Sequence, residues 1–380
     1  MPLIPVSVLT GFLGSGKTTL LARALTRPEL AQTAVIVNEF GEVGLDHLLI
    51  ARSDDSIVEL NSGCLCCTVR GDLVNTLGEL YDKRARGLIP AFDRVVVETT
   101  GLADPAPILH TLMTEPHLMS CYRLDGVITT VDAANGMDTL DRHEEAVKQA
   151  AVADRLVITK SDLPEARDQA LSERLAGINP GARVLRAVKG ELDPSHFFDA
   201  GLYNPENKSL DVRRWLAEES YGQGESAEDR HHHHAQDDEH GHDHGHDHAD
   251  VNRHDDRIRA FCITRDEPIS GSNFSLFLEL LTANRGPDLL RMKGIVDIAE
   301  RPGQPAVIHG VQHILHPVVW LDAWPDDGRG RTRLVFITRD LPAAWVERLL
   351  DALTGQSPSG QTPPDPGGDG EPLARAGGVA

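Results

Sequence analysis

One short segment near the N-terminus constrains the fold more than any other part of the chain. Residues 11–19 read Gly-Phe-Leu-Gly-Ser-Gly-Lys-Thr-Thr, which fits the pattern G-x-x-x-x-G-K-[ST] between an apolar stretch at 4–9 and a helical pattern from Lys17. Glycines let the backbone turn its N–H groups toward one centre, and the following helix adds its positive dipole end. We therefore predict a phosphate-binding loop made of Gly11, Gly14, Ser15, Gly16, Lys17, Thr18 and Thr19.

The chemistry of bound phosphates assigns roles within and beyond this loop. We expect Lys17 to neutralise the β- and γ-phosphates and the Thr18 hydroxyl to bind Mg²⁺. A second acidic group is needed at the end of another strand, and Glu98 ends the apolar stretch 94–97. The N–H of Gly101 would then contact the γ-phosphate. The alternative for Glu98 is a strand-end carboxylate that faces solvent.

A third segment indicates which base the nucleotide carries. Thr159, Lys160 and Asp162 form the pattern T-K-x-D at the end of the apolar stretch 155–159, close to the N-K-x-D of GTPases. The Asp162 carboxylate would accept hydrogen bonds from the guanine N1–H and 2-amino group, so we predict GTP as the nucleotide. Thr159 departs from the commoner Asn, and Asp162 has an alternative role as the N-cap of the next helix, with Pro164 just inside it.

The hydrophobic pattern predicts an α/β fold in two domains. Upstream of residue 192, the apolar runs are short, rich in Val and Ile, and nearly continuous, which is typical of parallel strands buried on both faces. We predict a doubly wound, mostly parallel sheet over 1–192, with strands at 4–9, 34–37, 94–97, 126–131 and 155–159. A small α+β domain is expected over 258–354, with strands at 258–264, 294–298, 306–309, 311–315 and 334–337 and helices at 274–281 and 343–353.

Composition excludes several classes of protein. The chain has 380 residues and a net charge of −21, which argues against nucleic acid as a partner. No apolar run is long enough to span a membrane, and the N-terminus has no basic flank before an apolar stretch, so we expect a cytoplasmic protein. Five cysteines in a chain of this length do not make a disulfide framework.

Much of the acidic charge is concentrated in one segment. Residues 218–256 hold 13 acidic and 2 basic side chains together with ten histidines, and almost no apolar residue. We predict a linker over 193–257 with a disordered metal-binding loop at 231–248, where neutral imidazoles would make weak, exchangeable sites. The alternative is a solvated linker of biased composition. The tail at 355–380, rich in Gly and Pro, is expected to be disordered.

Three cysteines fall within four positions of the first domain. Cys64, Cys66 and Cys67 follow Gly63 in the sequence Gly-Cys-Leu-Cys-Cys. Thiolates are soft ligands suited to Zn²⁺ or Cu⁺, and two or three of them this close can bind one ion with a position left open. Buried structural cysteines or a redox pair are the alternatives.

The ordered set of motifs resembles the CobW family of metallochaperone GTPases. The phosphate-binding loop is followed by Asn-Glu-Phe-Gly-Glu at 38–42, Gly-Cys-Leu-Cys-Cys at 63–67, Glu-Thr-Thr-Gly-Leu-Ala-Asp-Pro at 98–105 and Thr-Lys-Ser-Asp at 159–162. The resemblance implies a GTPase whose C-x-C-C motif binds Zn²⁺ and transfers it to a client metalloprotein. It also leaves Co²⁺ delivery for cobalamin synthesis open, as well as a homodimer.

The resemblance further implies which residues act in the switch and at the metal. Glu42 lies in a segment where a switch would be, and it is our candidate for contact with Mg²⁺ or the attacking water; the alternative is an ordinary loop carboxylate. His110 could add a nitrogen ligand, although a lone His is more often structural. From a different class of function, the histidine-rich loop also fits a metal store or sensor in which GTP turnover is incidental.

Overall fold

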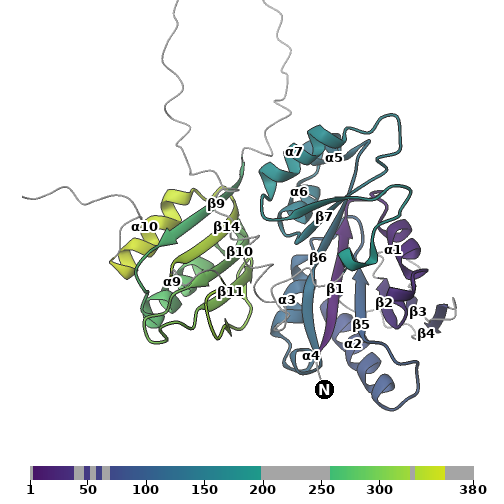
Figure 1. Cartoon of the computed structure of the whole chain (residues 1–380), viewed down its shortest axis with the longest axis horizontal. Helices are drawn as coiled ribbons and strands as arrows, with labels where there is room; N and C mark the ends of the chain where they lie inside the picture. Colours follow the sequence, from purple (N-terminus) through teal and green to yellow (C-terminus); the bar gives the residue numbers. More distant parts are fainter. Residues whose placement is uncertain are drawn as a thin grey trace, which may run out of the picture.

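The computed structural model describes residues 3–37, 47–51, 57–61, 69–197, 257–325 and 330–355. These residues form two units, each built on its own sheet (Figure 1). We call residues 3–197 the first unit and residues 257–355 the second unit. Among the described residues, no helix is both long and apolar enough to cross a membrane.

The first unit is built on an eight-stranded sheet with the order β4-β3-β2-β5-β1-β6-β7-β8. Its strands are β1 (Ile4–Gly11), β2 (Thr33–Val37), β3 (His47–Ala51), β4 (Ile57–Asn61), β5 (Arg94–Glu98), β6 (Tyr122–Asp132), β7 (Arg155–Thr159) and β8 (Arg183–Arg186). The six neighbouring strands β2, β5, β1, β6, β7 and β8 are parallel. Beyond β2, the strand β3 pairs antiparallel with β2, and β4 pairs antiparallel with β3 at the edge of the sheet. The predicted mostly parallel sheet is confirmed.

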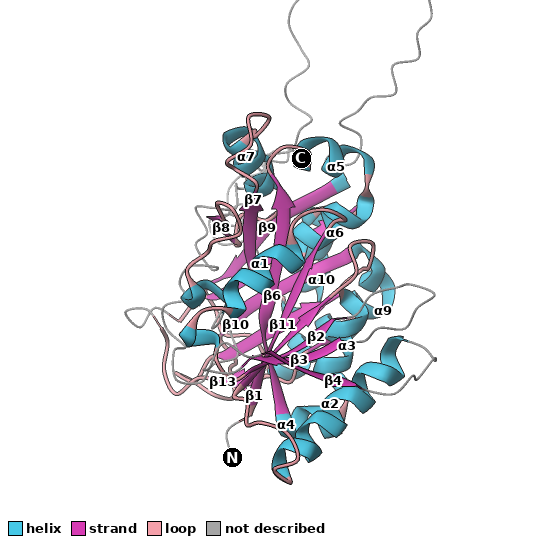
Figure 2. Cartoon of the chain, turned by 90° about the vertical axis from the view of Figure 1, so that its right-hand side faces the viewer, coloured by secondary structure: helices cyan, strands magenta, loops and turns pink. Residues whose placement is uncertain are grey.

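Helices cover both faces of this sheet. They are α1 (Lys17–Leu25), α2 (Val69–Ala85), α3 (Ala106–Thr114), α4 (Pro116–Cys121), α5 (Gly136–Arg142), α6 (Glu144–Ala151) and α7 (Asp168–Ile178), with short 3₁₀ helices at Pro28–Leu30 and Pro194–Phe197. Figure 2, which views the first unit from the side away from the second, shows α1 crossing in front of the strands. The crossover helices place the carboxyl ends of β1, β5, β6 and β7 at one edge of the sheet.

Alternation along each strand explains why the apolar runs are continuous. On β1, Leu9 packs in the cluster under α1, whereas Val6 and Val8 pack in the cluster under α2, α3 and α4. Successive side chains of a strand point to opposite faces, so a strand buried on both faces needs apolar residues at every position. The central strand β1 is consequently buried over most of its length.

The second unit is a mostly antiparallel sheet with two helices on one face. Its elements are β9 (Ile258–Arg265), α9 (Gly271–Arg285), β10 (Leu289–Val296), β11 (Ala306–Val311), β12 (Ile314–Leu315), β13 (Val319–Trp320), β14 (Thr332–Arg339) and α10 (Ala343–Thr354), with a 3₁₀ turn at Gly286–Asp288. Phe277, Phe336 and Leu350 lie at the centre of its core. The predicted α+β fold is confirmed for this unit.

Strand boundaries in the second unit differ most from the expectation at two places. The strand expected at 294–298 is observed as β10, over Leu289–Val296. Separate strands were expected at 306–309 and 311–315, but β11 continues through Gly310 to Val311 and the chain reverses at Gln312. Gln312 adopts a φ of 53°, in the left-handed region, which a tight turn between β11 and β12 requires. The apolar pattern 311–315 concealed this turn because no glycine marks it.

Candidate nucleotide site

The predicted phosphate-binding loop has the backbone geometry that its glycines allow. Gly11, Gly14 and Gly16 all have positive φ, of 139°, 73° and 90°. A Cβ at Gly11 would lie 2.3 Å from Thr130 Oγ1 and 2.4 Å from the Thr130 carbonyl oxygen. No side chain fits at Gly11, where close packing against β6 adds to the positive φ, whereas Gly14 and Gly16 are favoured by their backbone conformation.

Lys17 closes this loop from inside. Its Nζ donates hydrogen bonds to the carbonyl oxygens of Gly11 at 2.7 Å and Phe12 at 3.2 Å. The ammonium group therefore lies within the curve of the loop, where the phosphates of a nucleotide are expected. Ser15 also belongs to the loop, and its hydroxyl is 2.6 Å from that of Thr130.

Two oxygen groups that are distant in sequence meet beside the loop. The Thr18 hydroxyl donates to Glu98 Oε1 at 2.5 Å, from the first turn of α1 to the end of β5. Glu98 is only 4% exposed, so the alternative of a solvent-facing carboxylate is wrong. A hydroxyl and a carboxylate in contact are oxygen ligands that a hard cation such as Mg²⁺ accepts.

The turn after β5 lies directly against the phosphate-binding loop. A Cβ on Gly101 would be 2.5 Å from the backbone nitrogen of Leu13 and 2.7 Å from its Cα. The Thr99 hydroxyl donates to Thr10 Oγ1 at 2.8 Å and anchors the start of the turn. Only glycine permits this approach of two backbones. Because Gly101 is the residue predicted to contact the γ-phosphate, we call residues 99–104 the phosphate-sensing turn.

Thr159, which replaces the commoner Asn, also holds the loop. Its hydroxyl donates to the Ser15 carbonyl oxygen at 2.7 Å and lies 3.3 Å from that of Val131. The side chain is buried, and its Cβ would lie 3.6 Å from a Cβ on Gly16. The hydroxyl thus connects the carboxyl end of β7 to the phosphate-binding loop.

Lys160 is fixed by a carboxylate that the sequence analysis did not identify. Lys160 Nζ contacts Asp132 Oδ2 at 2.6 Å, and the backbone of Lys160 has a φ of 58°. Burial raises the pKa of Asp132, but hydrogen bonds from Lys160, Asn135 and the Ala134 N–H outweigh it, so the pKa lies below its usual range. The signal that could have identified Asp132 is its position at the end of the apolar run of β6. The carboxyl end of β6 lies at the same sheet edge as those of β1, β5 and β7.

Asp162 lies in a loop near a second segment that the sequence analysis missed. Asp162 Oδ1 accepts a hydrogen bond from the Lys189 backbone N–H at 3.4 Å, just after β8. The next helix, α7, begins at Asp168 with Arg167 as its N-cap, so the alternative role of Asp162 as that N-cap is wrong. The signal that could have identified Lys189 is its position just after β8, a further parallel strand of the same sheet.

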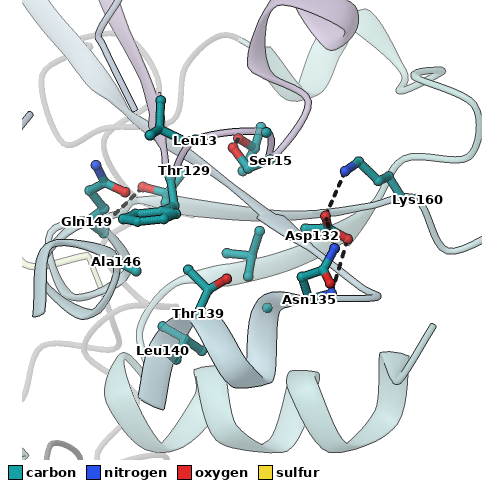
Figure 3. A pocket seen from close by; sticks show the side chains of 15 residues that line it. Leu13, Ser15, Thr129, Asp132, Asn135, Thr139, Leu140, Ala146, Gln149 and Lys160 are labelled. Carbon is teal, nitrogen blue, oxygen red and sulfur yellow. Dashed lines mark hydrogen bonds and ion pairs between the residues drawn. The ribbon is translucent and has the colours of Figure 1, made fainter. Parts of the chain in front are cut away.

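A cavity of about 240 Å³ adjoins the loop on the side of α5 and α6 (Figure 3). Its lining includes Phe12, Leu13, Thr139, Leu140 and Gln149 and is mainly apolar. Gly14, Ser15 and Lys160 of the predicted nucleotide site line it, whereas Lys17, Thr18 and Asp162 do not, so the cavity overlaps only part of that site. Figure 3 shows the Asp132–Lys160 ion pair at its far end.

Several predicted site residues lie outside the described residues. These are Glu42, Cys64, Cys66 and Cys67, together with the histidine-rich loop 231–248. Within the described part of the chain, no group of three His, Cys, Asp or Glu side chains is placed to bind a metal ion. His110 is described, and its Nε2 lies 2.9 Å from the Val311 carbonyl oxygen of the second unit.

The arrangement at this sheet edge defines a P-loop GTPase. A glycine-rich loop enclosing a lysine, a Thr–Glu oxygen pair and a T-K-x-D segment all meet at the carboxyl ends of parallel strands. Residues 5–186 match the CobW/HypB/UreG nucleotide-binding domain, and residues 258–354 match the cobalamin synthesis protein cobW C-terminal domain.

Similar proteins span nearly the whole chain. The zinc chaperone YjiA of Escherichia coli is 34% identical over 350 residues, which cover 92% of this chain and 98% of that protein. The zinc chaperone CobW of a Sinorhizobium species is 28% identical, with 92% and 97% covered. The crystal structure of Zn(II)-bound YjiA GTPase aligns with a TM-score of 0.67 at 28% identity, covering 93% and 99%. The chain therefore belongs to the CobW family.

Proposed function

We propose that this protein is a cytoplasmic, GTP-hydrolysing zinc chaperone that transfers Zn²⁺ from Cys64, Cys66 and Cys67 to a client metalloprotein. The observation that carries the proposal is the combination of the nucleotide site with a relative named as a zinc chaperone over 92% of the chain. A zinc-regulated GTPase metalloprotein activator of Schizosaccharomyces pombe is also 34% identical, over 54% of this chain. The ordered C-x-C-C motif supplies thiolates suited to the cargo ion.

The described residues suggest how the nucleotide is held. Lys17 would exchange the carbonyl oxygens of Gly11 and Phe12 for phosphate oxygens, since it already lies inside the loop. Thr18 and Glu98 would hold Mg²⁺, which would neutralise charge on the phosphates. Gly101 would donate its backbone N–H to the γ-phosphate from a turn that already contacts the loop.

Base selection provides the first test. Asp162→Ala removes the carboxylate that would accept hydrogen bonds from the guanine N1–H and 2-amino group. We expect GTP binding to weaken more than tenfold, and ATP binding to stay as weak as in the unmodified protein. Lys17→Ala should abolish binding of both nucleotides. Competition between GTP and ATP against a fluorescent guanine nucleotide measures this selectivity. Equal competition in the unmodified protein would show that the base assignment is wrong.

The metal site is tested through its link to the nucleotide. Mg²⁺-GTP should tighten Zn²⁺ binding, and Zn²⁺ should raise GTP affinity by the same factor. The two factors are equal because the binding steps of the two ligands form one closed thermodynamic cycle. Replacing Cys64, Cys66 and Cys67 by Ser should remove the tight site and leave GTP binding intact. Cys262→Ser on β9 is the matched control and should change neither. A titration against a chromophoric chelator with GTP, GDP or no nucleotide measures each case.

The same titration distinguishes the rival functions. Deleting residues 231–248 should remove weakly bound ions but retain the single tight site and GTP hydrolysis. Loss of the tight site would instead assign the cargo to the histidines and favour a metal store or sensor. Repeating the experiment with Co²⁺ tests cobalt as the cargo: tighter coupling of Co²⁺ than of Zn²⁺ to GTP would favour the cobalt chaperone.

A further inference from the structure

The phosphate-sensing turn is connected to the second unit as well as to the nucleotide site. This turn leads directly into α3, and α3 and α6 lie on the side of the first unit that faces the second (Figure 1). The helices contact β10, β11 and β12 of the second unit. Any displacement of the turn would therefore act on an interface between the two units.

The β11–β12 turn of the second unit docks on α3. Val311 is fully buried and packs in the core cluster of the first unit, which also contains Leu109 of α3. The Val311 carbonyl oxygen lies 2.9 Å from His110 Nε2 in a buried hydrogen bond. The rings of His110 and His313 meet edge to face at 4.8 Å. These contacts hold the tip of the β11–β12 turn against the helix that follows the phosphate-sensing turn.

Gln312 extends the contact to the phosphate-sensing turn itself. Its Nε2 donates to Asp104 Oδ2 at 3.3 Å, and the left-handed backbone of Gln312 is what turns the chain at this point. The other carboxylate oxygen, Asp104 Oδ1, accepts from the Ala106 N–H at 2.9 Å, at the first residue of α3. Asp104 therefore joins the end of the phosphate-sensing turn, the start of α3 and the second unit.

The opposite flank of the turn is held through α6. Gln149 is fully buried, and its Nε2 donates to the carbonyl oxygens of Gly101 at 3.3 Å and Ala103 at 3.0 Å. Three residues after α6, Asp154 Oδ1 lies 2.6 Å from both Arg291 and Lys293 of β10. At the N-terminal end of α6, Glu144 pairs with Arg339 of β14. Both helices that flank the turn are thus tied to the second unit.

We propose that Gln312, supplied by the second unit, is a positioning residue for the phosphate-sensing turn, so that GTP binding and the β11–β12 turn are thermodynamically linked. The proposal rests on the nucleotide site proposed above. A γ-phosphate that binds the Gly101 N–H selects one position of residues 99–104, and Asp104 carries that position to Gln312. GDP lacks the γ-phosphate and makes no such selection. The coupling is therefore specific for GTP over GDP and acts equally in both directions.

The full-length protein and three variants test the linkage. Gln312→Ala removes the amide but keeps a Cβ at the left-handed position, so the backbone cost stays the same. We expect the ratio of affinities for a non-hydrolysable GTP analogue and GDP to fall about fivefold, the effect of one hydrogen bond worth about 1 kcal/mol. GDP affinity should not change. Gln304→Ala, on an exposed turn of the same unit, is the matched control.

Gln312→Glu adds a sharper comparison, because it keeps the shape of the side chain and places a second carboxylate against Asp104. The affinity ratio should fall further than in Gln312→Ala, and Asp104→Asn should restore part of it in the double variant. Hydrogen exchange of the amides at 310–314 should be slower with the GTP analogue than with GDP in the unmodified protein. That difference should vanish in Gln312→Ala.

Two outcomes would overturn the linkage. An unchanged affinity ratio in Gln312→Ala would show that the second unit does not position the turn. Equal losses of GTP and GDP affinity, accompanied by a lower melting temperature, would assign Gln312 a structural role only. Failure of the nucleotide assignment is distinguishable, since it would appear as absent GTP binding in the unmodified protein, before any variant is compared.

Discussion

Single hydroxyl and carboxylate groups set the shape of the nucleotide site. The Thr159 hydroxyl fixes the phosphate-binding loop by donating to the Ser15 carbonyl oxygen, and the Asp132 carboxylate fixes Lys160 by an ion pair. Neither role follows from the motif letters alone, because T-K-x-D names the residues without stating what each one contacts. A hydroxyl reaches only as far as its immediate neighbour, so small changes at such positions should have large local effects.

Thr159→Val tests the role of this hydroxyl. The substitution keeps the shape but leaves the buried carbonyl oxygens of Ser15 and Val131 without their hydroxyl donor, which costs about 1–3 kcal/mol. We expect weaker nucleotide binding and a lower melting temperature. Thr159→Ser retains the hydroxyl and serves as the control. Calorimetric titration with GDP measures the affinity, and identical behaviour of the two variants would contradict the role assigned to the hydroxyl.

Whole elements bring these groups together. Parallel strands with crossover helices place the ends of β1, β5, β6 and β7 at one sheet edge, so residues 80 positions apart, Thr18 and Glu98, meet at 2.5 Å. The sequence predicted these strands from their continuous apolar runs. It did not predict the antiparallel strands β3 and β4. Their pairing depends on the free backbone groups along the outer side of β2 rather than on a local pattern.

Gly101→Ala tests the packing between two of these elements. The new Cβ would lie 2.5 Å from the Leu13 backbone nitrogen, so the phosphate-sensing turn must move away from the phosphate-binding loop. We expect GTP affinity to fall at least tenfold and GDP affinity to change little, because only GTP offers a γ-phosphate to the turn. Comparative titrations with a GTP analogue and GDP measure the difference.

Gly177→Ala is the matched control for that substitution. Gly177 lies in α7, where an added Cβ would meet no neighbouring side chain within 4 Å, and alanine favours a helix by about 0.5–1 kcal/mol over glycine. Nucleotide affinities should stay unchanged, and the melting temperature should stay the same or rise. Comparable losses in both glycine variants would point to general destabilisation and contradict a specific role for Gly101.

At the scale of the whole molecule, ion pairs join the two units at a buried position. Asp154 of the first unit is buried against Arg291 of the second, and the partly buried Lys293 pairs with the same carboxylate. Burial alone would raise the pKa of Asp154, but the two cations hold it well below its usual range. Burial lowers the pKa of His309 to about 4, against the opposing effect of Asp154 and with a further lowering from His316.

We expect both groups to make the protein less stable in acid. The pKa of His309 is lowered on folding, so the unfolded chain takes up its proton first, and stability present above pH 6.5 is lost progressively toward pH 4. The loss is on the order of 3 kcal/mol. The contribution of Asp154 persists to lower pH, since it is present above the ordinary Asp pKa of about 3.9 and is lost only as pH falls further.

His309→Gln should flatten the stability profile between pH 6.5 and 4. Urea unfolding followed by tryptophan fluorescence reports mainly on the second unit, which contains Trp320, Trp324 and Trp345 of the four tryptophans. His117→Gln, at a residue exposed on α4, is the control and should keep the slope of the unmodified protein. A slope that is the same in all three proteins would show that another group titrates in this range.

Local sequence was sufficient to predict the phosphate-binding loop, the T-K-x-D segment and the α/β character of both units. Each of these depends on steric freedom at glycine or on hydrophobic periodicity, which act over a few residues. Tertiary packing was needed to establish that Asp132 holds Lys160 and that Gln312 reaches Asp104, and it brings Thr18 and Glu98, which the sequence predicts to share one Mg²⁺, into direct contact. These pairs join residues far apart in the chain, and strand order and packing between the units, rather than any local pattern, bring them within hydrogen-bonding distance.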